Sequence, residues 1–274
     1  MKDSYTKMVL GASVLIAALG AALLVAIAPA KGATTHKCLG LQATIVGTSA
    51  ADTLTGTEGD DVIVGLDGDD RISGLSGDDT LCGGKGSDVL HSHDQEAFDK
   101  DCAEEAYDNA SISGGKGNDR LYGGGYVVKL AGNRGNDLLD GCTRSYYALA
   151  VYSGSQVPVK VNLKKGFAKG EGYDTLRNIN SVNGSAFNDV LIGSDYTQLI
   201  ATGSASEYLF GDSGRDKVVG LGGPDHLSGS NGRDQLLGVD GEAGNDELYG
   251  GLGADSCLGD SAAGVSDYQE SCES

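Results

Sequence analysis

The chain has 274 residues, of which 45 are Gly, 39 are Asp or Glu and only 20 are Lys or Arg, so its formal net charge is −19. This charge argues against a nucleic-acid-binding protein, which needs a basic surface to neutralise phosphates. The 3 Pro residues are too few for a collagen-like triple helix. So much Gly beside so many carboxylates favours either disorder or repeated tight turns that bind cations.

Residues 1–30 have the features of a secretory signal peptide. Lys2 and Lys7 precede an apolar run over residues 8–28, and the small residues Ala-Pro-Ala follow at 28–30. We therefore expect a secreted, extracellular protein that is cleaved after this segment. The alternative is an uncleaved anchor at the cell surface, because about 20 apolar residues are enough to span a bilayer. Cleavage would remove two Lys and one Asp and leave a net charge of −20.

Six Cys follow the predicted signal peptide. An even number of Cys in an exported chain predicts disulfide bonds. A zinc site is the alternative, but no Cys-x-x-Cys spacing supports it. Two Cys near the C-terminus lie far from the other four in sequence, so they form the clearest pair. The pairs that we predict are Cys257–Cys272, Cys38–Cys82 and Cys102–Cys142.

A nine-residue repeat runs through most of the chain. From Gly56 four rows follow one another as GTEGDDVIV, GLDGDDRIS, GLSGDDTLC and GGKGSDVLH. Their shared pattern, G-x-x-G-x-D-x-(aliphatic)-x, occurs in eleven copies, and a weaker row begins at Gly47. Nine-residue steps also run from Gly184 to Leu237, before three extra residues at 238–240 interrupt the register.

The chemistry of one row predicts the fold. Gly at positions 1 and 4 permits a tight loop, and the short Asp side chain at position 6 turns back into that loop. The aliphatic residue at position 8 is the one inward side chain of a three-residue strand. Two rows then complete one turn of a flattened solenoid, so rows 18 residues apart stack as parallel strands about 4.8 Å apart. The predicted fold is an all-β parallel β-roll, a β-solenoid, interrupted by an acidic loop insertion and a degenerate middle section.

Stacked Asp side chains repel each other and require a cation between them. Calcium takes six to eight oxygen ligands from carboxylates and backbone carbonyls, which Gly-rich loops expose. Magnesium fits less well because it demands octahedral geometry and releases water reluctantly. The sequence therefore predicts several bound Ca²⁺ ions.

The nonapeptide resembles the GGxGxD repeat of hemolysin-type (RTX) calcium-binding proteins. The segment 157–193 is also similar to a spacer that is typical of RTX arrays, and the resemblance covers most of residues 43–260. It implies a parallel β-roll in which calcium lies between same-side loops of successive turns. The matching position-6 residues are Asp61, Asp70, Asp79, Asp88, Asp119, Asp137, Asp216, Asp225, Asp234, Asp246 and Asp255, and Asp52 and Asp189 hold that position in weaker rows.

The chain departs from this family in two respects. Many RTX proteins leave the cell through an uncleaved C-terminal signal, whereas this chain has an N-terminal one. Many also join the repeats to a catalytic or toxin domain, which the sequence does not reveal here.

The 18-residue spacing predicts which carboxylates are neighbours. A single Asp in one row would be read as a solvated turn residue, whereas contiguous rows indicate metal binding. Pairs beyond the three-residue interruption depend on how the solenoid absorbs it, and the row between Asp119 and Asp137 has lost its Asp. The predicted neighbours are Asp52 and Asp70, Asp61 and Asp79, Asp70 and Asp88, Asp119 and Asp137, Asp216 and Asp234, and Glu207 and Asp225.

The remaining segments complete the predicted organisation. After the signal peptide we expect an N-terminal cap and first roll block (31–91), an acidic insertion (92–113), degenerate repeats and spacer strands (114–183), a second roll block (184–260) and a C-terminal cap (261–274). His91 and His93 are interpreted as part of an exposed loop, with a transition-metal site as the weaker alternative. The four Lys residues at 160, 164, 165 and 169 are interpreted as a solvated face.

The sequence thus predicts a secreted, monomeric, calcium-binding protein that folds on binding Ca²⁺ and is not an enzyme. The non-repeat segments are too short for a separate catalytic domain. Two alternatives remain. One is a calcium-dependent adhesion or matrix module that binds a cell surface or an extracellular polymer. The other is a β-solenoid lyase or epimerase acting on acidic polysaccharide, which would need a basic, aromatic-lined groove.

Overall fold

The computed structural model describes residues 35–93, 108–142, 145, 147–187, 189–194, 199–201, 208–220, 223–239, 246–262, 265–266 and 268–273. These residues form strands and loops only, and the fold is the predicted β-solenoid. Within them, no helix has the length and hydropathy needed to cross a membrane. The predicted signal peptide lies outside the described residues.

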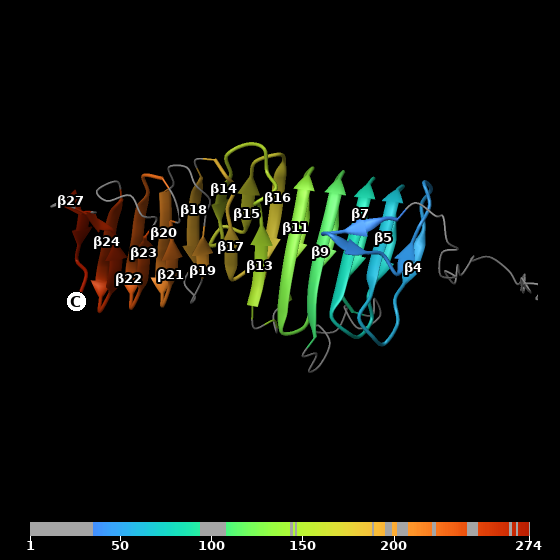
Figure 1. The fold of residues 1–274 in the computed structure, drawn as a ribbon, viewed down its shortest axis with the longest axis horizontal. Helices are drawn as coiled ribbons and strands as arrows, with labels where there is room; N and C mark the ends of the chain where they lie inside the picture. Colours follow the sequence, from blue (N-terminus) through green and yellow to red (C-terminus); the bar gives the residue numbers. More distant parts are fainter. Residues whose placement is uncertain are drawn as a thin grey trace, which may run out of the picture.

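Two long sheets run along the solenoid, with each strand stacked beside the equivalent strand of the next turn (Figure 1). In the described part of the chain, the first sheet consists of β4 (Thr53–Thr55), β6 (Arg71–Ser73), β8 (Val89–His91), β10 (Arg120–Tyr122), β12 (Leu138–Asp140), β14 (Lys160–Asn162), β15 (Phe167–Lys169), β16 (Tyr173–Arg177), β18 (Val190–Ser194), β20 (Tyr208–Gly214), β22 (His226–Gly232), β24 (Glu247–Gly253) and β28 (Tyr268–Glu270). The second sheet, with the same scope, consists of β3 (Ile45–Val46), β5 (Val62–Asp67), β7 (Asp79–Lys85), β9 (Asn109–Lys116), β11 (Val127–Arg134), β13 (Tyr147–Val151), β17 (Ser181–Asn183), β19 (Leu199–Ala201), β21 (Lys217–Val219), β23 (Gln235–Gly238) and β25 (Ser256–Gly259).

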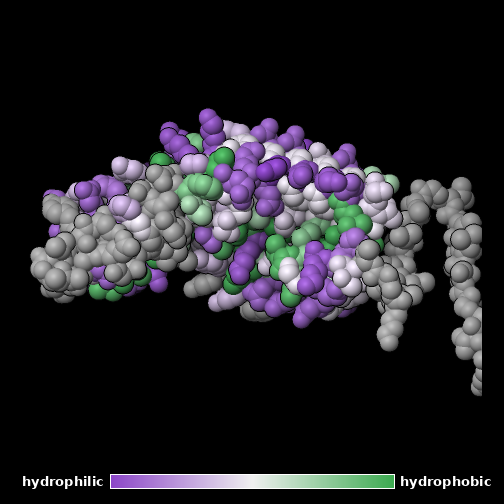
Figure 2. Space-filling model, turned by 45° about the horizontal axis from the view of Figure 1, so that its top comes forward, coloured by the Kyte–Doolittle hydropathy of each residue, from purple (hydrophilic) through white to green (hydrophobic). Residues whose placement is uncertain are grey.

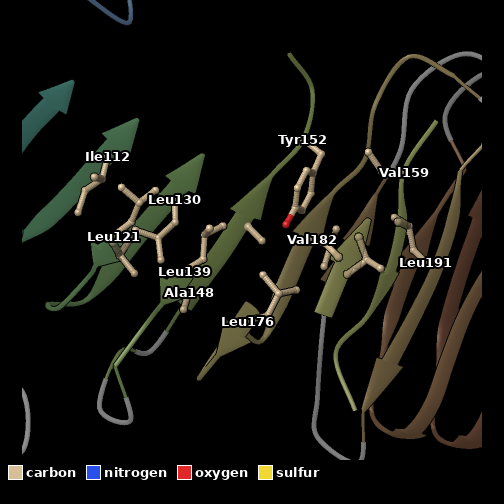
Figure 3. Packing of buried hydrophobic residues seen from close by; sticks show 14 of the residues in the cluster. Ile112, Leu121, Leu130, Leu139, Ala148, Tyr152, Val159, Leu176, Val182 and Leu191 are labelled. Atoms are coloured by element: carbon tan, nitrogen blue, oxygen red, sulfur yellow. The ribbon is translucent and has the colours of Figure 1, made fainter. Parts of the chain in front are cut away.

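The aliphatic residues at position 8 form the core between the sheets. In the first sheet, Leu54, Ile72 and Leu90 follow one another in register, and each is at most 2% exposed. Leu121 and Leu139 continue this stack, as Figure 3 shows. Fully burying such a side chain contributes about 1.5–3 kcal/mol. Because each row supplies one main inward side chain, the core is a single narrow column.

Both sheets continue through the segment without clear repeats, so the two predicted roll blocks form one solenoid. In the second sheet, β13 and β17 keep the parallel pairing. In the first sheet, however, β15 runs antiparallel between β14 and β16. This hairpin departs from the parallel pairing of the predicted β-roll, and its chain folds back at a turn where Gly166 has a φ of 68°.

Strand β9 begins at Asn109, inside the segment predicted as an acidic insertion. It pairs in parallel with β7, with Ala110 opposite Asp79. Residues 109–113 therefore belong to the solenoid, and residues 94–107 of the predicted insertion lie outside the described residues.

Disulfides fasten both ends of the solenoid. Near the N-terminus, β1 (Lys37–Cys38) and β2 (Leu41–Gln42) form an antiparallel hairpin beside β5 and β7 (Figure 1). The predicted Cys38–Cys82 bond is confirmed, with an S–S distance of 2.01 Å. The Cys257–Cys272 bond is confirmed at the other end, near the hairpin of β26 (Ser261–Ala262) and β27 (Val265–Ser266). Cys142 is also disulfide-bonded, but its predicted partner Cys102 lies outside the described residues.

Candidate metal sites at the edges of the solenoid

The Asp side chains lie in the loops along the two edges of the solenoid. We call the loops that lead into the first sheet the first edge, and those that lead into the second sheet the second edge. In the N-terminal half, the long strands of the second sheet, such as β7 and β9, run on into the first-edge loops. In the C-terminal half, the long strands β20, β22 and β24 run on into the second-edge loops. The loops that continue a strand also keep its register with the next turn.

A hydrogen-bonded ladder of carboxylates follows the first edge. At each step, the backbone N–H of one Asp donates to Oδ1 of the Asp in the next turn. The successive donors and acceptors are Asp52 to Asp70, Asp70 to Asp88, Asp88 to Asp119 and Asp119 to Asp137, all at 2.8 Å, and then Asp137 to Asp174 at 3.0 Å. The row without an Asp leads into β11 on the second edge, so it does not interrupt this ladder. The predicted pairs Asp52–Asp70, Asp70–Asp88 and Asp119–Asp137 are confirmed.

The other carboxylates repeat this bond. On the second edge, Asp61 donates to Asp79 at 2.9 Å, Asp216 to Asp234 at 2.8 Å, and Asp234 to Asp255 at 2.9 Å. On the first edge, Asp225 donates to Asp246 at 2.9 Å across 21 residues, so the three extra residues are absorbed without breaking the ladder. Glu207, the predicted neighbour of Asp225, lies outside the described residues.

The second carboxylate oxygen has no such bond in most rows. Oδ2 is buried and receives no hydrogen bond from the described residues in Asp70, Asp79, Asp88, Asp119, Asp137, Asp234 and Asp255. These side chains are at most 3% exposed. A buried polar atom without a partner costs free energy, and a charged one costs much more. The carboxylates therefore need a positive charge beside them.

Glycine makes room for each of these oxygens. A Cβ on Gly65 would collide with Oδ2 of Asp70 and with the carbonyl oxygen of Gly83, one turn further on. A Cβ on Gly114 would collide with Oδ2 of Asp119 in the same way. Position 1 of each row must therefore be Gly, because the carboxylate oxygen lies against its Cα.

Burial raises the pKa of these carboxyl groups. The pKa of Asp79 and of Asp119 rises to about 7, and that of Asp88 to about 6, chiefly because burial disfavours the charged form. Neighbouring ladder carboxylates raise the pKa further, while the backbone hydrogen bond to Oδ1 lowers it. A bound cation would remove this penalty, so metal and protons would compete for the same oxygens.

The donor set fits calcium. No group of three or more His, Cys, Asp or Glu side chains converges on one point in the described part of the chain. Further ligands must therefore be backbone carbonyls, which the loops present along the solenoid axis. A Cβ on Gly117, for example, would collide with the carbonyl oxygen of Gly86. Carboxylates combined with carbonyls are the oxygen donors that Ca²⁺ prefers.

Three predicted ligands have a different environment. Asp52, Asp61 and Asp189 each accept hydrogen bonds at Oδ2 from within their own loop. The structure thus places all thirteen predicted residues at the edges of the solenoid, with Asp79 at the start of β7, but in these three Oδ2 is already bonded within the loop.

A second ladder was missed by the sequence analysis. In the position-6 ladder, an N–H donates to the side chain one turn later. At position 5 the direction is reversed, because each side chain accepts the backbone N–H of the residue one turn later. Asp60 accepts from Asp78 at 2.9 Å, Asp69 from Ser87 at 2.8 Å, and Asn118 from Asn136 at 2.8 Å. The frequent Asp or Asn directly before the position-6 Asp is the sequence signal for this ladder.

The prediction that His91 and His93 lie in an exposed loop is wrong. His91 ends β8 and is 6% exposed, because its ring stacks on Tyr122 of β10 at a centroid distance of 4.6 Å. His93 is 8% exposed and lies 2.8 Å from the Ser92 hydroxyl through Nδ1. Burial lowers the pKa of His91 to about 4. These rings contribute to packing at the place where the insertion leaves the solenoid.

Comparison with known families agrees with this geometry. A family model described as the RTX calcium-binding nonapeptide repeat (4 copies) matches residues 44–67, 55–90, 108–125, 202–238 and 239–264. No curated protein sequence matches the chain. The matched segments contain most of the rows whose Asp residues form the ladders. The chain therefore contains several copies of the RTX calcium-binding nonapeptide repeat, folded as a parallel β-roll.

Proposed function

We propose that this calcium-binding β-roll is a secreted, non-catalytic protein that folds when it meets calcium outside the cell. The observation that carries the proposal is the row of buried carboxylate oxygens without hydrogen-bond donors, such as Oδ2 of Asp70, Asp88 and Asp119. Without a cation, each of these groups opposes folding. With Ca²⁺, each becomes a ligand and stabilises the folded chain.

Export is supported by the signal-like N-terminus and the disulfides. Calcium is abundant outside cells, so binding there would supply the free energy that the narrow core lacks. Binding to the folded state stabilises by about 2.7 kcal/mol per site at a hundredfold excess of calcium over Kd. Several sites together would rival the whole stability of an ordinary domain, about 5–15 kcal/mol.

A calcium titration followed by far-ultraviolet circular dichroism tests the proposal. The oxidised chain without its first 30 residues should change cooperatively from a disordered to a β spectrum with Ca²⁺, and Mg²⁺ at the same concentration should not produce the change. A β spectrum that ignores both calcium and chelator would refute calcium-driven folding. Turnover of uronate polymers would contradict the non-catalytic role.

A cationic stripe favours a second candidate function, the binding of an acidic extracellular polymer. Lys85, Lys116 and Arg134 end three adjacent strands of the second sheet and are register partners. Parallel neighbours lie about 4.8 Å apart, so the three cationic residues follow one another at the spacing of the strands. Asp67 pairs with Lys85 at 2.9 Å at one end, and Glu171 pairs with Arg134 at 3.2 Å at the other.

The stripe lines an open groove that also contains apolar side chains, including Val64 and Leu66. On the face of the molecule that Figure 2 shows, hydrophilic side chains predominate and small hydrophobic groups lie between them. On a chain with a net charge of −19, local cations in a groove suit a linear polyanion such as a uronate glycan.

Binding to polyuronate in the presence of calcium tests this second function. Lys116→Glu should weaken retention, and Lys129→Glu is the matched control, because Lys129 is exposed on the neighbouring strand β11 but lies outside the groove. Equal loss in both variants would indicate a general charge effect and would refute the stripe as the site.

A further inference from the structure

In two rows, a Thr of the same loop donates hydrogen bonds to the Oδ2 atom of the ladder Asp. We call such a carboxylate and its row closed, and we call a row open when Oδ2 has no hydrogen-bond donor among the described residues. Thr48 donates its backbone N–H to Oδ2 of Asp52 at 2.6 Å and its Oγ1–H to the same oxygen at 2.9 Å. Thr57 binds Asp61 in the same way, at 2.6 Å and 2.9 Å. Both Thr residues hold position 2 of their rows. The oxygen that stays open in other rows is therefore already saturated in these two.

Serine closes a third row. Ser185, also at position 2, donates its backbone N–H to Oδ2 of Asp189 at 2.5 Å and its hydroxyl to Oδ1 at 2.7 Å. Oδ1 of Asp189 also accepts the backbone N–H of Val159 at 2.8 Å. Both oxygens of this carboxylate are bonded to protein donors.

The same hydroxyls give these loops a different backbone. Each hydroxyl also accepts the backbone N–H of position 4, from Ala50 at 3.2 Å, Gly59 at 3.2 Å and Phe187 at 3.1 Å. Open rows instead need a left-handed Gly at position 4, such as Gly68 with a φ of 120°. Ala and Phe are tolerated at this position because the closed loops do not require positive φ there.

The closed rows stand where carboxylate stacks begin. Asp52 and Asp61 belong to the first rows on the first and second edges. Asp189 belongs to the first row after the antiparallel hairpin of β15. Open carboxylates follow Asp52 and Asp61 one turn later, at Asp70 and Asp79.

A tyrosine closes the far end of the first stack. Asp174 accepts the Asp137 N–H at Oδ1, and the Tyr152 hydroxyl donates to its Oδ2 at 3.0 Å. Tyr152 is 7% exposed and its hydroxyl points inward between the strands (Figure 3). A hydroxyl therefore closes the first-edge stack of the N-terminal half at both ends.

We infer that a protein hydrogen bond to the second carboxylate oxygen determines whether an Asp of these stacks binds calcium, and that Asp52, Asp61, Asp174 and Asp189 bind none. A hydroxyl at position 2 is not sufficient by itself, because the Ser230 hydroxyl lies 3.3 Å from that of Ser228 and leaves Oδ2 of Asp234 without a donor. In these rows the donors of Thr48, Thr57, Tyr152 and Ser185 stand in for the ion. Calcium goes to rows whose position 2 lacks a hydroxyl bond to the carboxylate. This inference rests on the proposed calcium binding and assigns its sites more narrowly than the repeat pattern does.

Calcium titration calorimetry of matched variants tests the inference. Asp61→Asn and Asp79→Asn remove neighbouring carboxylates on the same edge, and Asn keeps the size and one acceptor oxygen. Asp61→Asn should bind as many ions as the wild type, with Kd changed by no more than about twofold. Asp79→Asn should lose about one ion or weaken binding by about tenfold or more.

A second variant opens a closed row. Thr57→Leu changes GTEGDD to GLEGDD, which matches the open rows that contain Leu66 and Leu75. It should gain a calcium ion, because the lost hydroxyl holds both Oδ2 of Asp61 and the Gly59 N–H. Without it, the loop is expected to take the backbone of the open rows, in which the N–H of residue 57 no longer donates to Oδ2. Thr57→Ser is the matched control and should bind as many ions as the wild type, because it keeps a hydroxyl at this position.

The outcomes separate the two proposals. A wild-type chain that binds no calcium would refute the proposed function and this inference together. Wild-type binding combined with equal losses in Asp61→Asn and Asp79→Asn, or with no loss in either, would refute the inference alone. A Thr57→Leu variant that folds and gains no ion would also overturn it.

Discussion

Replacing Asp119 with Asn should have opposite effects on the metal-free and the calcium-loaded protein. Asp119 is 1% exposed, and burial raises its pKa from 3.8 to about 7. Each pKa unit corresponds to about 1.4 kcal/mol, so keeping the group ionised at pH 8 costs at most about 4 kcal/mol. Because the edge loops border solvent, which screens charges, we reduce this to about 2 kcal/mol.

Asn removes that cost and retains an acceptor for the Asp88 N–H, which lies 2.8 Å from Oδ1. The metal-free Asp119→Asn protein should therefore be about 2 kcal/mol more stable than the wild type at pH 8. In saturating calcium it should be less stable, and its calcium midpoint should rise about tenfold, because one charged ligand is lost.

Urea unfolding at pH 8 measures both effects, with chelator or with calcium, in an osmolyte that keeps the metal-free wild type folded. Asp52→Asn is the matched control on the same edge. Its Oδ2 is already bonded to Thr48, so it should bring no gain without metal. Destabilisation of Asp119→Asn under both conditions would refute the claim that the open carboxylates oppose folding.

Three further predictions follow from the same geometry. Because the folded pKa of Asp79, about 7, lies above its ordinary 3.8, its contribution to stability is lost as pH rises through 7. The urea midpoint in chelator should therefore rise between pH 8 and pH 6.5, and a flat profile would contradict this. Gly117→Ala, at a φ of +132° and against the backbone of Gly86 in the preceding turn, should cost about 1–3 kcal/mol in urea unfolding. Gly59→Ala, whose nearest neighbour would be 3.9 Å away, should change stability by less than about 0.5 kcal/mol, and equal costs would refute the close-approach argument. Replacing Cys38 and Cys82 with Ser removes a bond that spans 44 residues and should cost about 4 kcal/mol by thermal or chemical unfolding; a loss below about 1 kcal/mol would mean that the N-terminal hairpin adds little.

The repeat predicted most of this molecule because each position has one physical task. The spacing of 18 residues was enough to pair Asp70 with Asp88, and the aliphatic position was enough to place Leu121 and Leu139 in the core. Gly at position 1 was predicted as a turn residue. The structure adds that the Asp119 carboxylate lies against Gly114, which no turn rule requires.

The parts that the sequence did not predict lie where the repeat is lost. The sequence around β15 lacks the nine-residue repeat, so nothing in it predicts the direction of this strand. A short strand can pair with a neighbour in either the parallel or the antiparallel orientation. Tyr152 and Asp174 are 22 residues apart, and no repeat relates them. The burial of His91 depends on stacking with Tyr122, which lies 31 residues later in the chain. The sequence next to His91 is typical of a loop and gives no sign of this contact.

The closed rows also escaped the sequence analysis, although their signal is present in it. Thr48, Thr57 and Ser185 stand at the position that Leu66 and Leu75 hold in open rows, and two of these closed rows also lack Gly at position 4. A consensus that writes this position as any residue discards the distinction. Only the hydrogen bonds show that a hydroxyl here satisfies the same oxygen that a cation would bind.

The division between closed and open rows explains how such a chain can depend on calcium and still fold in a defined register. If every carboxylate were open, no turn would be stable before metal arrived, and any 18-residue offset would be equally good. Closed rows at Asp52 and Asp61 are satisfied by their own loops, and the Cys38–Cys82 bond holds the adjacent turns together. The N-terminal end therefore forms a metal-independent start on which the next row can align. The rows that follow add open carboxylates, at Asp70, Asp79 and Asp88, which are unfavourable until a cation binds. Under the proposed function, calcium would therefore control how far the roll extends, whereas the hydroxyls would determine where it begins.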